Sequence, residues 1–448
     1  MVFLNARLPR CGGLFSDEGA EVNAPQRRSV VESPSGAEVG TPLAATPYGN
    51  KEVEILMSCA RLQLEEKDIR RIRQLVGQEP DWDRLILLAV FHRLTAFVVQ
   101  NLTAAAADIV PVRTLEILRT RFIQDGATAL RQTAELLEIL RLFREARIYA
   151  IPYKGPVLAA YVYGNLAYRR CMDLDVLISR QDVPRARDLL EKSGYVPRHS
   201  MSPAGREFLL NHRHSEIFER PSSPVLELHW AFAKQRGMFA MGVEELRPRL
   251  GTRNVGGVAV PVLNPEDLLL VLCVHGANHL WSRLEWLCSI AELLKKEPLN
   301  WSEAMRYATD YHVEKYVILG TLLAHDLLGA PIPESVLDRA RSDRSIVRLA
   351  SIVGQKLAAA DVEHAETLNS VERDLFRLRL QSTTKDRLRY LSHRLTTPSR
   401  EDTRLMVPLG RGTVPLPAIL RPFHVLGVLI AGIFRPADPK KRYPQRKK

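Results

Sequence analysis

The 448-residue sequence predicts an α+β protein in which a small mixed sheet is flanked by N- and C-terminal helical regions. Apolar residues recur at helical spacing from Glu52 to about Arg147, and again from Asn264 to about Leu395. Between these stretches the chain changes to short apolar runs bounded by turn residues, which is typical of strands. The expected segments are a disordered leader at 1–50, a helical region at 51–147, an α/β core at 148–263, a helical domain at 264–400, and a Pro-rich, apolar C-terminal segment with a basic tail at 401–448.

In the N-terminal helical region, the sequence predicts helices and the position where one of them begins. Apolar residues recur at helical spacing in LLEILRLF (136–143), and Asp81 or Asp83 is expected to cap the helix that runs into LILLAVFHRL. His92, on that helix, is expected to be a hydrogen-bonded packing residue rather than a metal ligand.

The central unit reads as alternating strands and helices. RIYAIPYKG (147–155) is expected to be a short strand ending in a turn, and Pro156 then opens a helix that ends at Gly164. MDLDVLIS follows as a strand, and Asp182 is expected to cap a helix that stops at Gly194. SEIFE and VLELHW are two further strands, joined by the turn RPSSP.

Composition limits the possible classes of protein. With 63 Lys and Arg against 51 Asp and Glu, the formal charge is +12, which suits nucleic acid, an anionic membrane or a phosphate-rich substrate, or simply a solvated basic surface. Five scattered cysteines without a CxxC pair argue against a disulfide framework and a structural zinc site. Neither a signal peptide nor a 20-residue apolar stretch occurs, so a cytoplasmic protein is expected.

The apolar segment PFHVLGVLIAGIF (422–434) is followed by the basic tail RPADPKKRYPQRKK. A short apolar segment with a basic flank could lie on a membrane surface. The other interpretation, which the sequence favours, is a C-terminal helix docked on the core.

The chemistry is expected where acids interrupt an apolar strand. Asp173 and Asp175 share one strand face, so their like charges require a cation or an arginine, such as Arg169 or Arg170, beside them. Glu227 is likewise an acid inside the apolar run VLELHW. Three carboxylates at one sheet edge form a site suited to Mg²⁺, and two such ions can activate a hydroxyl and stabilise a leaving pyrophosphate.

A turn upstream of these acids is suited to phosphate. Gly155 permits close backbone approach, the helix opened by Pro156 presents free N–H groups, and Lys154 can pair with a phosphate. A phosphate-binding turn, then DxD, then a later acid in a strand is the order that nucleotidyl transfer requires.

Three histidines accompany these residues. His229 would share the strand face of Glu227 and orient that acid. His275 and His279 lie four apart on a predicted helix, as in the HExxH zinc motif, but no glutamate lies between them. We expect this pair to pack beneath the site or to contact a phosphate, rather than to form a zinc hydrolase.

These motifs also resemble a known family. YKGPVLAAYVYGNLAYRRCMDLDVLI (153–178), a helix ending in SGY, and VLELHW are similar to the uncharacterised nucleotidyltransferase family of bacteria, within the DNA polymerase β-like superfamily. VLCVHGANHLWSRLEWLCSIAELL (271–294) matches the family's His-rich helix. The resemblance spans roughly residues 55 to 435 and is most specific in the centre.

The resemblance implies a mixed sheet whose strands hold two Mg²⁺ ions, with an NTP as donor substrate. By position, Asp173, Asp175 and Glu227 would be metal ligands and catalytic acids, while Lys154, Gly155 and Arg169 would contact the nucleotide. The chain departs from the pattern in three respects: Pro156 follows the turn glycine where the superfamily has serine, the 18 positions from Gly155 to Asp173 exceed the usual spacing to the acids, and Ser289 replaces the usual Asp.

Two functions therefore remain as hypotheses. One is an Mg²⁺-dependent enzyme that transfers an NMP group from an NTP to an acceptor hydroxyl of a sugar, metabolite, RNA or protein, and its relatives suggest a polysaccharide or natural-product pathway. The alternative is a non-catalytic nucleotide sensor or interaction module of a biosynthetic assembly. A nucleic-acid-binding protein is a weaker third reading, because no RNA-binding aromatic motif or zinc finger occurs. The sequence does not predict the oligomeric state.

Overall fold

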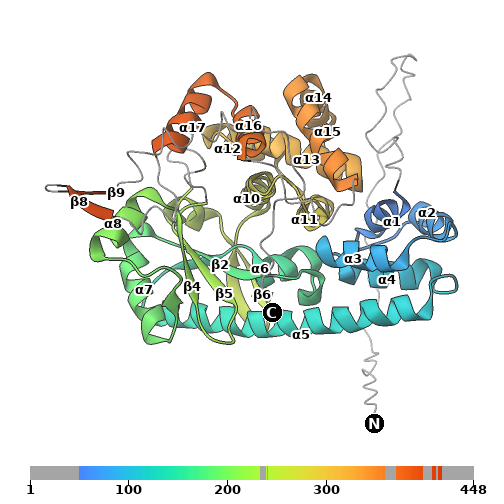
Figure 1. Ribbon diagram of the computed structural model, residues 1–448, viewed down its shortest axis with the longest axis horizontal. Coiled ribbons are helices and arrows are strands. Elements are labelled where there is room, and N and C mark those ends of the chain that lie inside the picture. The colour runs from blue at the N-terminus through green and yellow to red at the C-terminus, as the bar shows by residue number, and fades with distance from the viewer. Residues whose placement is uncertain are drawn as a thin grey trace, which may run out of the picture. The chain divides into compact units, whose positions relative to one another are not determined.

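The structure is a computed structural model that describes residues 50–232, 239, 241–358, 370–396, 406–409 and 412–415. The leader at 1–49 and the apolar segment at 422–434 lie outside the described residues, so the expectations about them stay predictions. The described part is an α+β arrangement in which helices precede and follow a five-stranded mixed sheet (Figure 1). This is the predicted fold class. The division into five segments stays a prediction.

The N-terminal region consists of helices. They are α1 (Lys51–Cys59), α2 (Glu66–Val76), α3 (Trp82–Phe91), α4 (Thr95–Ala106) and α5 (Val112–Glu145). Asp81 caps α3 by accepting a hydrogen bond from the backbone N–H of Arg84, as one of the two expected caps. In Figure 1 the long helix α5 runs beside both the other N-terminal helices and the sheet.

The sheet has the strand order β1-β2-β5-β4-β3. Its strands are β1 (Ala150–Pro152), β2 (Asp173–Ile178), β3 (Val196–Pro197), β4 (Ser215–Glu219) and β5 (Val225–His229). Strands β2 and β5 are parallel, whereas the other pairs are antiparallel, so the sheet is mixed as predicted. Leu174, Val176 and Leu228 are almost completely buried, which explains why these strands read as apolar runs.

Short helices connect the strands. They are α6 (Gly155–Leu158), which continues as a π-helical turn η2 (Ala159–Tyr163), then η3 (Leu166–Tyr168), η4 (Arg180–Asp182), α7 (Val183–Lys192) and α8 (Pro203–His212). Gly164 ends the first of these with φ +68°, as its residue type predicts. Asp182 occupies the cap position of α7, but its side chain does not bond the helix backbone and instead accepts from Arg185.

The central sheet is followed by a β-hairpin that was not predicted from the sequence. After α9 (Val243–Leu246) and η5 (Arg247–Arg249), β6 (Gly251–Val255) and β7 (Val258–Val262) pair antiparallel around Gly256 and Gly257. Both glycines have positive φ, which a two-residue hairpin turn requires.

The C-terminal region is helical from Asn264, which caps α10 through the backbone N–H of Asp267. The helices are α10 (Pro265–Asn278), α11 (Leu284–Lys296), α12 (Trp301–Asp310), α13 (Glu314–Leu328), α14 (Glu334–Ser342), α15 (Arg344–Ala358), α16 (Ser370–Arg379) and α17 (Thr384–Thr396). A hairpin of β8 (Met406–Leu409) and β9 (Gly412–Pro415) comes after them. None of the helices described has the length and apolar character to cross a membrane.

Candidate active site

The three predicted acids lie on neighbouring parallel strands. Asp175 of β2 is directly in register with Glu227 of β5, and Asp173 precedes Asp175 by two residues. Because successive side chains alternate between the faces of a strand, all three project from one face of the sheet. The structure therefore brings together residues that are more than 50 positions apart in the chain, as the sequence predicted.

The Asp175 carboxylate is buried and surrounded by three polar groups. The Lys154 ammonium lies 2.9 Å from Oδ1, and Nε2 of His229 lies 3.1 Å from the same oxygen. The Tyr153 hydroxyl approaches it at 3.4 Å. Burial alone would raise the pKa of Asp175, but the charges of Lys154 and His229 outweigh burial and hold it below its usual value. Asp175 is therefore ionised in this arrangement.

Asp173 has a different environment. Its carboxylate makes no hydrogen bond or ion pair with another described residue, and it faces a cavity. Burial, and next the charge of Asp175, raise the pKa of Asp173 above its ordinary value. The two aspartates thus differ: Asp175 is neutralised by protein groups, whereas the charge on Asp173 lacks a direct partner in the described part of the chain.

Of the two partners considered for the aspartates, a cation or an arginine, the arginine is not observed among the described residues. Arg169 is buried and directs one guanidinium nitrogen at Cys171 Sγ, 3.5 Å away, and Arg170 pairs with Asp125 at 3.7 Å. Neither arginine forms an ion pair with the two aspartates among the described residues, and Lys154 takes that role for Asp175. The sequence could not show this, because the strand β1 that carries Lys154 to Asp175 is placed by sheet topology. Arg169 still lines the same cavity as Asp173.

Glu227 belongs to a second group of potential metal ligands. Its Oε1 accepts a hydrogen bond from Ser215 at 2.7 Å, and its Oε2 lies 3.7 Å from Nε2 of His229. One ligand atom from each of His214, Glu227 and His229 falls within 4.8 Å of the others. His229 therefore contacts both acids, as its position on the strand face predicted. Two imidazoles with one carboxylate favour ions such as Mn²⁺ or Zn²⁺ over Mg²⁺.

The turn after β1 has the backbone geometry that its glycine implies. Gly155 has φ +61°, a conformation that side-chain-bearing residues rarely adopt, and it begins α6. Pro156 occupies the first turn of that helix, where its missing N–H costs nothing. This geometry holds Lys154 against Asp175, so the turn and the acids form one cluster.

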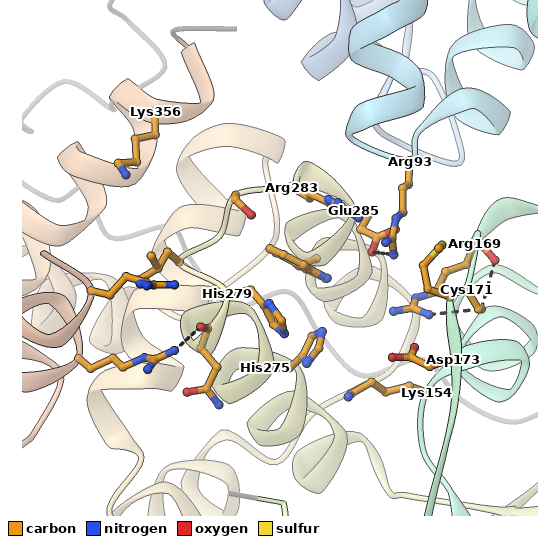
Figure 2. A pocket seen from close by; sticks show the side chains of 17 residues that line it. Arg93, Lys154, Arg169, Cys171, Asp173, His275, His279, Arg283, Glu285 and Lys356 are labelled. Carbon is orange, nitrogen blue, oxygen red and sulfur yellow. Dashed lines mark hydrogen bonds and ion pairs between the residues drawn. The ribbon is translucent and has the colours of Figure 1, made fainter. Parts of the chain in front are cut away.

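A cavity of about 530 Å³ opens from this cluster toward the C-terminal helices. Figure 2 shows Lys154 and Asp173 on one side of it, His275 and His279 near its middle, and Lys356 on the far side. Its lining contains seven basic side chains and two acidic ones. The basic residues are Arg93, Lys154, Arg169, Arg283, Lys356, Arg373 and Arg377.

His275 and His279 line this cavity rather than forming a separate site. Their ring centroids are 4.7 Å apart, and both rings contact the indole of Trp286. Burial, and next the charge of Lys154, lower the pKa of His275, so its imidazole is neutral at pH 7. Through these ring contacts the pair packs against α11 in the wall of the cavity.

Ser289, which stands where the resembled family usually has Asp, is also buried close to this region. Its hydroxyl lies 2.8 Å from the Tyr163 hydroxyl and donates to the backbone carbonyl of Glu285. The position therefore anchors the π-helical turn η2 to α11.

Comparison with known proteins decides the family. Residues 78–329, more than half of the chain, match the family described as uncharacterised nucleotidyltransferase. The chain belongs to this nucleotidyltransferase family. The family activity implies an NTP as donor substrate, and the family description names no acceptor.

Other comparisons add little. No curated protein matches the chain. Among solved structures, the lincomycin-bound lincosamide antibiotic adenylyltransferase LnuA is similar at 17% identity, over 31% of this chain and 83% of LnuA, with a TM-score of 0.23. A TM-score this low carries no argument about this chain.

Several residues of the site were not predicted from the sequence. His214 precedes the strand SEIFE, and its proximity to His229 depends on the pairing of β4 with β5. Arg93 reaches the cavity from the turn between α3 and α4, and Lys356, Arg373 and Arg377 reach it from α15 and α16. An isolated basic residue in a turn or on an amphipathic helix resembles any solvated one, so no sequence signal could have identified these four.

Proposed function

We propose that this nucleotidyltransferase transfers an NMP group from an NTP to an acceptor hydroxyl, with Mg²⁺ ions bound by Asp173, Asp175 and Glu227. The observation that supports it best is the register of β2 and β5, which aligns Asp175 with Glu227 and leaves Asp173 facing a basic cavity. Carboxylates on one sheet face beside a cation-lined cavity suit a triphosphate with its counterions.

The donor set fits a divalent cation. Asp173 and Asp175 project from the same face of one strand. The Lys154 ammonium contacts Asp175 where a metal ion could also bind the carboxylate. Mg²⁺, when bound, would supply charge stabilisation for the phosphates and for the departing pyrophosphate. The imidazoles of His214 and His229 beside Glu227 also make Mn²⁺ a suitable ion on that side.

The protein groups have distinct tasks in this scheme. The acceptor oxygen attacks the α-phosphorus, the bond to the pyrophosphate oxygen breaks, and Glu227 receives the proton of the hydroxyl. Lys154, Gly155 and Arg169 bind and orient the phosphates, since Lys154 and Arg169 line the cavity next to Asp173. His229 holds Asp175 and Glu227 in place through its ring nitrogen.

A second candidate function is a nucleotide-binding module without turnover. The observation that favours it is that the Asp175 carboxylate already has two protein partners, the Lys154 ammonium and the His229 ring, and needs no metal ion. A buried carboxylate with two such partners can serve structure alone. Asp173, which lacks such partners in the described part, favours the enzyme.

Calorimetric titration tests the proposal. Each of the four common NTPs is titrated into wild type with and without Mg²⁺, and into Asp173→Asn and Asp188→Asn. Asp188 is an exposed carboxylate on α7 and serves as the matched control. We expect Mg²⁺-dependent binding that Asp173→Asn abolishes and Asp188→Asn retains. Binding of no NTP by the folded wild type would overturn the proposal.

Label transfer separates the two candidates. Wild type and Asp173→Asn are incubated with α-labelled NTP and a cell extract as a source of acceptors. Label on an extract component with wild type alone supports the enzyme, whereas tight nucleotide binding without any transfer supports the module.

A further inference from the structure

The far end of the cavity is basic in a way that the reaction centre does not explain. Lys356 comes from α15, and Arg373 and Arg377 come from α16. In Figure 2, Lys356 lies on the opposite side of the view from Lys154 and Asp173. Lys356 therefore belongs to a part of the cavity distinct from the carboxylates, and Arg373 and Arg377, on the next helix of the chain, line the same cavity.

The cations near the reaction centre already have protein partners. Lys154 pairs with Asp175 at 2.9 Å, and Arg93 pairs with Glu285 at 3.0 Å. Both acidic residues of the cavity lining, Asp173 and Glu285, are at that end in Figure 2. The positive charge at the far end is thus not balanced by the acids of the lining.

Lys356 and Arg373 are available for a ligand. Neither side chain makes a hydrogen bond or ion pair within the part of the chain that the structure describes. Lys356 is half-buried, and burial lowers its pKa although the nearby charge of Glu372 acts to raise it. Placing an ammonium where it is partly desolvated is costly unless an anion joins it.

Arg377 is held in position beside them. One guanidinium nitrogen donates a 2.8 Å hydrogen bond to the backbone carbonyl of Asn278, the last residue of α10. That bond also offsets the negative end of the α10 dipole, which would otherwise repel an anion. Its Nε is buried and lacks a hydrogen-bond partner among the described residues.

From these observations we propose that Lys356, Arg373 and Arg377 form a second anion subsite that binds a phosphate group of a substrate. Two guanidinium groups and an ammonium that line one cavity match the several acceptor oxygens and charge of a phosphate. The inference rests on the proposed function for the position of the reacting phosphate, but binding at the subsite itself does not depend on transfer. The phosphate belongs either to the end of the NTP chain or to the acceptor.

Equilibrium titrations test the subsite. Arg373→Ala and Lys356→Ala are compared with Arg379→Ala, which removes the same charge from the same helix outside the cavity. Titrants are an NTP, the corresponding NMP, and inorganic phosphate in the presence of a saturating non-hydrolysable NTP. We expect about a tenfold weaker affinity per variant, as for loss of one charge-assisted hydrogen bond.

The pattern of affinity changes among the three titrants identifies the source of the phosphate. Weaker NTP binding with unchanged NMP binding assigns the subsite to the end of the triphosphate. Weaker binding of inorganic phosphate with unchanged NTP binding assigns it to the acceptor. If Arg373→Ala and Lys356→Ala match Arg379→Ala with every titrant while wild type binds NTP, the subsite is wrong and the proposed function stands. If wild type binds phosphate through these residues but binds no NTP, the proposed function fails and the subsite stands.

Discussion

The Lys154 ammonium lies 2.9 Å from Oδ1 of Asp175, whose side chain is almost completely buried, whereas the Lys154 side chain is 11% exposed. Lys154 is the residue before the turn glycine, and Asp175 is the second acid of the DxD strand. The pair therefore joins the turn proposed to bind phosphate to the carboxylates, and its two residues are 21 positions apart in the sequence. In this arrangement the same lysine that would bind a phosphate neutralises a proposed metal ligand.

Breaking this pair should destabilise the fold. In Lys154→Met, the buried Asp175 charge keeps only the weaker contacts to His229 and the Tyr153 hydroxyl, and we expect a loss of about 3 kcal/mol in the free energy of unfolding. Urea unfolding of Lys154→Met, Asp175→Asn and the double variant measures the coupling, expected to exceed about 1 kcal/mol. Additive losses would show that the two residues do not depend on each other.

The turn glycine can be tested with a matched partner. Gly155 and Gly164 have φ of +61° and +68°, and an added Cβ would meet nothing closer than 3.6 Å at Gly155 and nothing within 4 Å at Gly164. Alanine at either position should cost about 1 kcal/mol through backbone strain alone. We expect only Gly155→Ala to weaken NTP binding in calorimetry. Equal effects on binding would remove Gly155 from the nucleotide site.

Packing explains why position 276, in the motif HGANHLW, is a glycine. A Cβ on Gly276 would lie 2.0 Å from the ring of Trp281, which is completely buried. Gly276→Ala should therefore destabilise the protein by about 2–3 kcal/mol, as overpacked cores do. Gly354, inside α15, leaves open space for a Cβ, so Gly354→Ala should be neutral or stabilising. Thermal unfolding of both variants checks this, and a stable Gly276→Ala protein would refute the packing argument.

His92 makes stability depend on pH. It is buried, and its Nδ1 accepts a hydrogen bond from the backbone N–H of Leu284, an arrangement that requires an unprotonated Nδ1. Burial, and next the charge of Arg283, lower the pKa of His92 from 6.5 to about 3. Between these values the unfolded chain binds more protons than the folded one, so stability is full above pH 6.5 and falls as the pH drops toward 3.

Urea unfolding at pH 7.5 and pH 5 measures this effect in wild type and His92→Gln. Wild type should lose about 2 kcal/mol more than the variant, since one pKa unit corresponds to about 1.4 kcal/mol. An equal loss in both proteins would mean that His92 titrates normally in the folded state.

The sequence predicted the elements better than their contacts. The strands around Asp173, Asp175 and Glu227 were evident because apolar runs and turn residues are local signals. The pairing of Lys154 with Asp175 was not, because it depends on β1 lying antiparallel to β2. The basic end of the cavity was also hidden, because Lys356 and Arg373 reach it only through the packing of α15 and α16.

We propose that Asp173, Asp175 and Glu227 hold the metal ions of this nucleotidyltransferase. A crystal structure of the full chain with Mn²⁺ and a non-hydrolysable NTP tests this, with anomalous scattering used to locate manganese. We expect anomalous signal bounded by these three carboxylates, together with a Lys154 side chain that has left Asp175 for a phosphate oxygen. Nucleotide bound elsewhere, with no manganese at the carboxylates and Lys154 still on Asp175, would contradict it.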